Sequence, residues 1–180
     1  NVGSGFLSSI STNALNLGSS VYVNGSGEDY VAWNWYAPTA ESNTNGSVNS
    51  TIKKNVDAGF SIATFTSDAS TITVGHGLDS IPDLIIVKAT SFSDSWFVNS
   101  SALTNQTDRA LRLNATSAEE TNSGFWNNTA PTSTTFSLGS GISVSGASYV
   151  AYSFVNVIGY QKIGSYPGNN STNGPEIVTG

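Results

Sequence analysis

Tyr149-Val150-Ala151-Tyr152-Ser153-Phe154 is the stretch that decides the fold class. Val150, Tyr152 and Phe154 alternate in it with the smaller Ala151 and Ser153. An apolar period of two residues, rather than about 3.6, predicts a half-buried β-strand instead of a helix. The same spacing recurs in three further pairs: Ile72 and Val74, Leu111 and Leu113, and Phe136 and Leu138.

A second type of strand is predicted at Asp83-Leu84-Ile85-Ile86-Val87-Lys88, which is apolar on both faces and charged at its ends. The preceding residues 75–82 contain two glycines and a proline, which predicts a turn. Roughly nine short strands over about a hundred residues is the spacing of a β-sandwich or jelly roll. We therefore expect an all-β, antiparallel, sandwich or jelly-roll-like fold. It would have at most one short helix, at 115–120, where Ser117 and Glu120 have capping-box spacing.

The chain contains an internal repeat. Landmarks between Gly5 and Trp33 recur in the same order between Gly124 and Tyr152, at an offset of 119 to 121 residues. A weaker echo links 59–65 with 159–166, and another links 72–75 with 177–180. The landmarks are Gly5-Phe6, Leu17-Gly18-Ser19, Val21, Val23, Gly25 and Tyr30-Val31-Ala32-Trp33, matched by Gly124-Phe125, Leu138-Gly139-Ser140, Ile142, Val144, Gly146 and Tyr149-Val150-Ala151-Tyr152.

This repeat predicts three parts. Residues 1–57 would hold the closing strands of a preceding repeat, followed by a linker or surface loop at 38–57, which is rich in Ser, Asn and Thr. Residues 58–157 would form a complete β-sandwich repeat, and 158–180 would open a following one. The chain would then be a window on a longer tandem array. The alternative is that 1–180 forms one sandwich.

Composition excludes several classes of partner. Only 10% of the residues are charged, against about 25% in an ordinary soluble domain, and six basic residues face twelve acidic ones for a net charge of −6. No basic stripe is available to neutralise phosphates, so nucleic acid is not expected as a partner. The longest apolar run, 84–87, is far below the roughly 18 residues of a membrane span, so no membrane insertion is expected. With no cysteine, the chain can have neither a disulfide nor a thiolate-bound zinc.

Residues for catalysis are scarce. His76 is the only histidine and lies between two glycines in the predicted turn, so we expect its imidazole to bond the backbone of that turn rather than serve a triad or a metal. Glu28-Asp29 and Glu119-Glu120 are adjacent carboxylates, which on a strand point to opposite faces. Asp68, Asp79, Asp83 and Asp94 are scattered without the spacing of a calcium loop. The sequence therefore predicts no catalytic, metal or cofactor residues and no enzyme.

Aromatic residues offer one candidate binding site. Trp33 and Trp35 share a strand face, and their repeat counterparts Tyr152 and Phe154 keep it aromatic, which predicts core packing. Trp96 also lies in a strand-like segment and is expected in the core. Only Trp126, beside Asn127 and Asn128, is expected in a loop. These three residues are the candidate glycan-binding site.

Several phrases of the sequence, taken together, carry a family resemblance. The phrases are Tyr30-Val31-Ala32-Trp33-Asn34-Trp35, Asn43-Thr44-Asn45-Gly46-Ser47, Ala58-Gly59-Phe60-Ser61-Ile62, Val74-Gly75-His76-Gly77-Leu78 with Pro82-Asp83-Leu84-Ile85-Ile86-Val87-Lys88, Trp126-Asn127-Asn128-Thr129-Ala130-Pro131-Thr132-Ser133, and Gly159-Tyr160 through Gly164-Ser165-Tyr166. In this order they resemble the tandem β-rich repeats of structural proteins from marine tailed bacteriophages, which are mostly tail-fibre, appendage or other virion components, some with lectin-like sandwich domains. The likeness covers about 5–180, although Tyr36-Ala37-Pro38 replaces the basic residue that usually follows the double tryptophan.

The resemblance implies a structural role on the virion surface, in a fibre, an appendage or a capsid decoration, without enzymatic activity. The expected partners are other virion proteins and further copies of the chain, with a host surface polysaccharide as a possible ligand. Two alternatives stay open. One is a lectin-like module that binds a host glycan, and the other is a subunit of a prokaryotic extracellular filament whose incomplete sandwich accepts a strand from its neighbour.

Overall fold

The computed structural model describes residues 5–11 and 14–178. The chain divides into two compact units, Asn1–Trp35 and Tyr36–Gly180, and each is described by itself. Within the described residues, no helix has the length and hydropathy of a transmembrane span.

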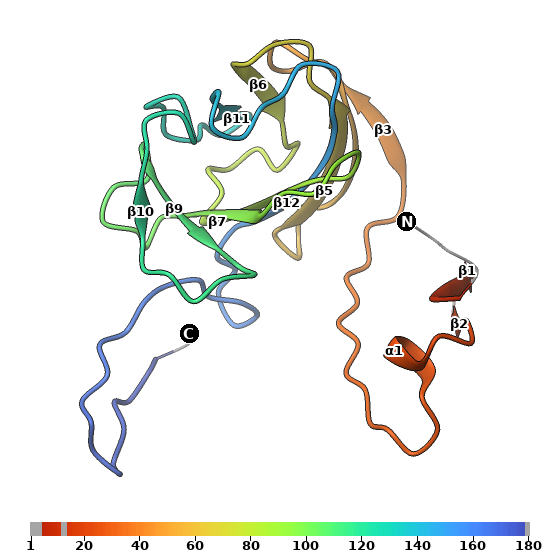
Figure 1. The fold of residues 1–180 in the computed structure, drawn as a ribbon. Helices are drawn as coiled ribbons and strands as arrows, with labels where there is room; N and C mark the ends of the chain where they lie inside the picture. Colours follow the sequence, from red (N-terminus) through yellow and green to blue (C-terminus); the bar gives the residue numbers. More distant parts are fainter. Residues whose placement is uncertain (1–4, 12–13, 179–180) are drawn as a thin grey trace. The chain divides into compact units, whose positions relative to one another are not determined.

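The unit Tyr36–Gly180 is built on one large antiparallel sheet (Figure 1). Its eight strands follow the order β10-β9-β8-β7-β12-β5-β4-β3. In chain order the strands are β3 (Ala40–Asn43), β4 (Ser50–Asn55), β5 (Phe60–Thr66), β7 (Leu84–Ala89), β8 (Trp96–Ser100), β9 (Arg109–Arg112), β10 (Glu120–Thr121) and β12 (Ser148–Phe154).

A small second sheet completes a sandwich. β6 (Ile72–Gly75) pairs antiparallel with β11 (Thr135–Leu138) along its whole length. Their apolar side chains share one buried cluster with side chains from the large sheet, among them Ile72 and Phe136 from the small sheet and Phe65 and Val87 from the large one. The expected antiparallel β-sandwich is therefore confirmed.

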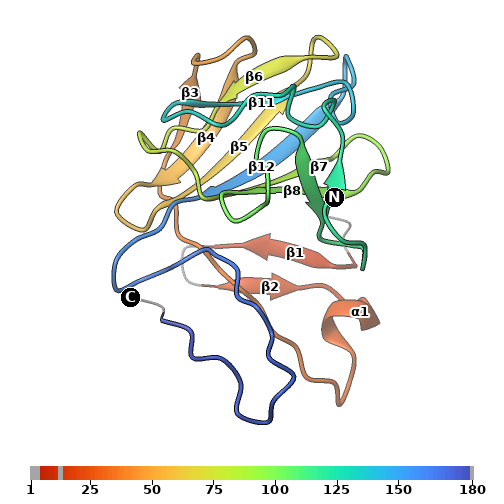
Figure 2. The same ribbon diagram turned by 90° about the vertical axis from the view of Figure 1, so that its left-hand side faces the viewer.

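β12 lies at the centre of the large sheet, between β5 and β7 (Figure 2). Ala151 stands opposite Ala63 on one neighbour and Val87 on the other, and all three are at most 1% exposed. Tyr149 and Ala151 face the core, whereas Tyr152 is half-buried on the opposite face. The prediction that Tyr152 marks the core face is wrong, because the small sheet covers only the face that carries Tyr149 and Ala151.

β7 confirms the central strand that the charged-ended apolar run predicts. It pairs with β12 on one side and with β8 on the other. Ile85, Val87 and Ala89 are buried, while Ile86 and Lys88 are half-buried on the other face. Both of its edges are thus satisfied by strand hydrogen bonds, as expected of a strand rich in β-branched residues.

The segment 38–57 is not the linker or surface loop that its composition suggests, since it forms β3 and β4 of the large sheet. Burial alternates along β4, where Ser50 and Ile52 are 3% and 1% exposed and Thr51 and Lys53 are exposed. Ser50 compensates its burial by donating its hydroxyl hydrogen to the carbonyl of Gly75. A polar side chain can therefore occupy a core-facing position, which hides the strand from an apolar pattern.

The helix expected at 115–120 does not form. Ser117 does donate to Oε1 of Glu120 at 3.5 Å, but Glu120 begins β10 and pairs with Ala110. Strand pairing thus outweighs the local capping bond. Among the described residues the one helix is α1 (Val21–Asn24), whose N-cap is Ser20.

In the unit Asn1–Trp35, α1 follows an antiparallel pair, β1 (Leu7–Ile10) and β2 (Leu15–Leu17). Residues 30–35 belong to no strand, and Trp33 and Trp35 are 81% and 47% exposed. The prediction that both tryptophans pack in a core from one strand face is wrong in this unit, because residues 30–35 form no strand and both side chains are exposed.

The segment after β12 also lacks strands within its described part. An isolated bridge joins Val157 and Gln161, and Gln161 donates from its side-chain amide to the carbonyls of Gly59 and Val155. The opening strands predicted for 158–180 are therefore not formed in 158–178. Thr179 and Gly180, which end the weaker echo, lie outside the described residues.

The two copies of the repeat share backbone hydrogen bonds as well as sequence. In each copy, the glycine of the Gly-Phe pair and the following phenylalanine accept from two amides near the Leu-Gly-Ser landmark. The bonds are Gly18 to Phe6 at 2.9 Å and Ser20 to Gly5 at 2.6 Å in the first copy, and Gly139 to Phe125 at 2.9 Å and Gly141 to Gly124 at 2.8 Å in the second. The repeat is thus a unit of local structure.

We predict that Tyr149→Phe destabilises the sandwich by about 1–3 kcal/mol. The buried hydroxyl donates to the Ile142 carbonyl and accepts from the Val144 amide, both at 2.9 Å, and the variant leaves both groups unpaired. Burial raises the pKa of Tyr149, which keeps the hydroxyl protonated as a donor. Urea unfolding measures the loss, with the exposed Tyr160→Phe as the matched control. Equal stability of the two variants would contradict the assignment.

Candidate functional site

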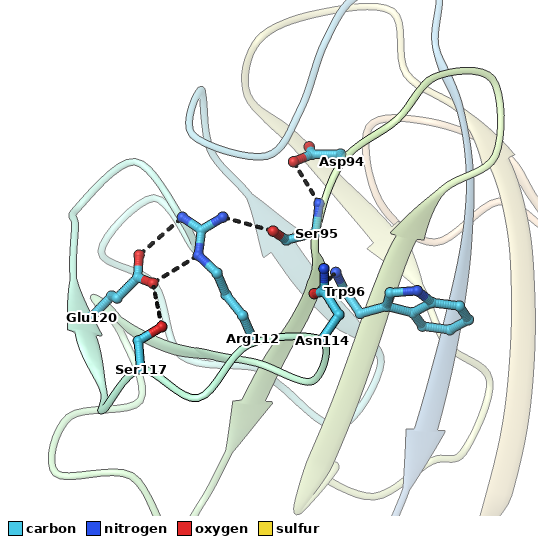
Figure 3. A network of polar contacts seen from close by, with 7 residues as sticks. All are labelled: Asp94, Ser95, Trp96, Arg112, Asn114, Ser117 and Glu120. Carbon is cyan, nitrogen blue, oxygen red and sulfur yellow. Dashed lines mark hydrogen bonds and ion pairs between the residues drawn. The ribbon is translucent and has the colours of Figure 1, made fainter.

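A network of polar contacts lies where β8, β9 and β10 meet (Figure 3). Arg112, the last residue of β9, holds Glu120 with two hydrogen bonds, from Nε to Oε1 at 2.7 Å and from Nη2 to Oε2 at 2.9 Å. Its Nη1 donates to Oγ of Ser95 at 2.8 Å. The guanidinium also lies over the ring of Phe97, 4.9 Å from the centroid. Every guanidinium nitrogen of Arg112 therefore has a carboxylate or hydroxyl partner.

The flanking residues fix the loops that enter and leave these strands. Asp94 accepts from the amide of Ser95 at 2.7 Å, and Asn114 accepts from the amide of Trp96 at 3.0 Å. The Trp96 ring stacks on Tyr152 of β12, with centroids 6.4 Å apart. Figure 3 shows Asp94, Ser95, Arg112 and Asn114 around the start of β8, with the Trp96 ring turned away from the guanidinium. The network thus fastens the end of the large sheet to its loops.

Electrostatics favour the charged forms of both Arg112 and Glu120. The hydrogen bonds from Arg112 lower the pKa of Glu120, and the same contacts raise the pKa of Arg112. A general acid needs a carboxyl pKa raised towards neutral pH, the opposite of what Glu120 has. The arrangement suits a clamp on the two-residue edge strand β10.

The adjacent carboxylates Glu119 and Glu120 form ion pairs with different arginines. Glu119 lies 3.7 Å from Nη1 of Arg109 and accepts from the amide of Thr104, while Glu120 pairs with Arg112. They do not form an acid–base pair. Asp83, one of the acids weighed for calcium, instead accepts from the Ser101 hydroxyl and the Asn156 amide. In the described part of the chain, no three His, Asp or Glu side chains gather as a metal site.

His76 is fully buried and has the role expected of it. Its Nδ1 accepts from the amide of Leu78, two residues along its own turn, at 3.2 Å. Its Nε2 lies 3.2 Å from the carbonyl of Thr132, so the neutral tautomer with a proton on Nε2 satisfies both contacts. Burial lowers the pKa of His76 despite opposing contributions from Thr132 and Asp79. The imidazole is a structural link between two loops.

The structure corrects the candidate glycan site. Trp126 is 1% exposed, and its indole Nε1 donates to the carbonyl of Arg109 at 2.7 Å. Asn127 and Asn128 are exposed, and both have positive φ, 54° and 49°, which turns the chain sharply after the tryptophan. The loop assignment was sound, but the ring points into the core and presents no platform to a sugar. The apolar Phe125 next to it in the sequence is the signal that could have shown this, since both rings are buried.

Trp96 is half-buried on the outer face of β8, outside the core where the sequence places it. Its contact with Tyr152 gives the outer face one aromatic stack. Of the four tryptophans, only the one expected at the surface is fully buried. Alternation identified β6, β11 and β12 correctly, but it did not identify which face the sandwich covers, and the alternating segment 30–35 is not a strand.

Sequence reasoning missed a groove of about 690 Å³ in the part of the large sheet formed by β4, β5 and β12. Exposed hydroxyl, amide and carboxylate groups line it. The only aromatic residues in the lining, Phe65 and Tyr149, are 5% and 2% exposed, so no ring faces the groove openly. Its polar side chains include Ser42, Asn49, Thr51, Thr64, Thr66 and Asp68.

Comparison with known proteins identifies the family. The chain belongs to the family described as a domain of unknown function (DUF7483), which matches residues 1–180. No curated protein and no solved structure shows significant similarity to it.

We predict that Trp126→Ala destabilises the sandwich by about 3–5 kcal/mol, because it leaves a cavity and an unpaired Arg109 carbonyl. Trp33→Ala is the matched control, since Trp33 is 81% exposed and its loss should change stability by less than about 0.5 kcal/mol. Urea unfolding followed by circular dichroism measures both. A stable Trp126→Ala variant would show that the indole is not a core residue.

We further predict that His76 lowers the free energy of unfolding as the pH falls through a defined window. Because the folded-state pKa of His76 is below its ordinary 6.5, the unfolded chain binds the proton more readily. The stability contribution is complete above the unfolded pKa and is lost as pH falls below it. His76→Asn, which keeps an acceptor for the Leu78 amide, should flatten the slope between about pH 7.5 and 5.5. Equal slopes for both proteins in urea unfolding at several pH values would refute this role.

Proposed function

We propose that this chain is a structural module of a tailed-phage particle, part of a fibre, an appendage or a capsid-surface decoration, without enzymatic activity. Its partners in this proposal are other virion proteins and further copies of the same repeat, and its location is the virion surface. The resemblance of its ordered phrases to phage structural repeats supports the proposal. The recurrence of one hydrogen-bonded framework in both units is the single observation that carries it.

The chemistry of the sandwich supports a structural role. The Arg112–Glu120 clamp, the buried His76 and the divided Glu119 and Glu120 all have partners that hold loops or strands. The edge strand β10 has two residues, and short edge strands limit uncontrolled pairing between sheets. A repeat on an exposed particle needs this protection, because many copies lie close together.

The geometry favours this role over the two alternatives. For glycan binding, the candidate ring of Trp126 is buried and the polar groove presents no open aromatic face. For a filament built by strand donation from the residues before Asn24, those residues instead pair with one another as β1 and β2. The first observation argues against a sugar platform at Trp126, and the second argues against strand donation by the residues before Asn24.

We expect purified particles to contain this protein in multiple copies. Quantitative mass spectrometry of gradient-purified virions should find its peptides at a constant ratio to the major capsid protein across the particle peak. A phage replication enzyme, abundant in the lysate but not in particles, is the control. If the capsid protein is detected and this protein falls to the level of the control, the virion role is rejected.

A further inference from the structure

Residues 30–35 form an extended segment with exposed apolar side chains. They read Tyr-Val-Ala-Trp-Asn-Trp, and Val31 and Trp33 are 82% and 81% exposed. This is the composition of a buried strand, with β-branched and aromatic residues in succession. Among the described residues, no strand pairs with them.

Their sequence counterpart is the central strand β12. With an offset of 119 residues, Tyr30 corresponds to Tyr149, and Ala32 corresponds to Ala151. The turn before each segment is also similar, since the glycine three residues before each tyrosine, Gly27 or Gly146, has a φ of 81°. The segment is thus preceded by a backbone turn similar to that before β12.

The tyrosine that begins each segment makes a similar pair of bonds, to one carbonyl and one amide that precede it. Tyr30 Oη donates to the Val21 carbonyl at 2.7 Å and accepts from the Gly25 amide at 2.8 Å. In the second copy, Tyr149 Oη binds the carbonyl of Ile142 and the amide of Val144, both at 2.9 Å. The amide lies five residues before the tyrosine in both copies, whereas the carbonyl lies nine residues before Tyr30 and seven before Tyr149. A scaffold similar to the one that starts β12 is therefore already assembled in the unit Asn1–Trp35.

The two segments differ in their neighbours. β12 is hydrogen-bonded to β5 along its whole length and to β7 from Tyr149 to Phe154. That position in the sheet of Tyr36–Gly180 is therefore filled. Residues 30–35 can have an equivalent position only in another sheet.

We infer that residues 30–35 form the central strand of a further copy of the repeat, inserted antiparallel between that copy's counterparts of β5 and β7. The inference rests on the tandem-repeat architecture of the proposed function and names the partner it requires. Main-chain bonds on both edges would supply the pairing, as in other cases of strand addition to a sheet.

The register of β12 specifies which side chains face the partner's core. Ala32 takes the place of Ala151, which is 1% exposed between Ala63 and Val87, so this position accepts only a small residue. Tyr30 and Asn34 share that inner face, because side chains alternate along a strand. Trp33 then takes the outer position of Tyr152.

A ring at the outer position, the place of Tyr152, has an aromatic residue to stack on. In the described sandwich, Tyr152 stacks on Trp96 with centroids 6.4 Å apart and an interplanar angle of 21°. Trp33 would stack in the same way on the further copy's counterpart of Trp96. Its exposure in the unit Asn1–Trp35 is then the consequence of an absent partner sheet.

The test adds the missing strands to the intact chain. Residues 36–119 are joined ahead of Asn1, which follows the 119-residue offset of the repeat and keeps 1–180 whole. Hydrogen exchange with mass spectrometry then compares peptides covering 30–35 in the fusion and in the unmodified chain. We expect exchange at 30–35 to slow at least about 100-fold in the fusion, close to that of β12 in the same molecule.

Ala32→Asp is the control within the fusion, because a carboxylate at the inner position cannot be buried there. It should abolish the protection of 30–35 and leave β12 protected. The inference is overturned if 30–35 exchanges freely while the added counterpart of β7 is protected. It is also overturned if Ala32→Asp changes nothing, which would indicate protection by pairing at a sheet edge instead.

A second variant tests the inference if the added strands themselves are not protected from hydrogen exchange. Tyr152→Trp, Ser153→Asn and Phe154→Trp together give β12 the sequence of 30–35. Ser153 lies opposite Ser61, whose buried hydroxyl has no hydrogen-bond partner, so an asparagine amide has a group to bind. The triple variant should keep β12 protected, and its unfolding would overturn the inference. These results are independent of whether virions contain the protein.

Discussion

The insertion of β12 between β5 and β7 is the constraint on which the rest of the sandwich depends. Without this strand, the large sheet would fall into a four-stranded part, β10-β9-β8-β7, and a three-stranded part, β5-β4-β3. Both halves come earlier in the chain than the strand that joins them. The sheet is therefore completed by pairing between distant segments, which is entropically costly until the whole sheet forms.

Several other features follow from this insertion. Ala151 allows β12 to lie under the small sheet, while Tyr149 stacks on Phe65 at 5.5 Å and holds the loop that leads into the strand. At the far end, the Arg112–Glu120 clamp secures the shortest strand to its neighbour. Charge contributes there as a local fastening, since few charged residues are present anywhere in the chain.

The sequence was sufficient for the fold class and for β7 because apolar periodicity reports directly on sheet burial. It was insufficient for β3 and β4, where Ser50 and Asn43 occupy buried positions as polar residues with hydrogen bonds. It also failed to place Trp126, because the orientation of a ring in a turn depends on two asparagines with positive φ rather than on composition. His76 was predictable, since a lone histidine between glycines has few partners other than its own turn.

Tyr30-Val31-Ala32-Trp33 and Tyr149-Val150-Ala151-Tyr152 show where local sequence stops determining structure. Both begin with a similar tyrosine bridge, yet only the second is a strand, because only it has strands on both sides. A strand's backbone groups need partners outside the segment, whereas a helix satisfies its own. In our inference, the apolar side chains of 30–35 therefore fit the sheet of a further copy of the repeat. In a tandem array, each unit would then end inside the sheet that it completes, and neighbouring units would be joined directly by the chain leaving that sheet.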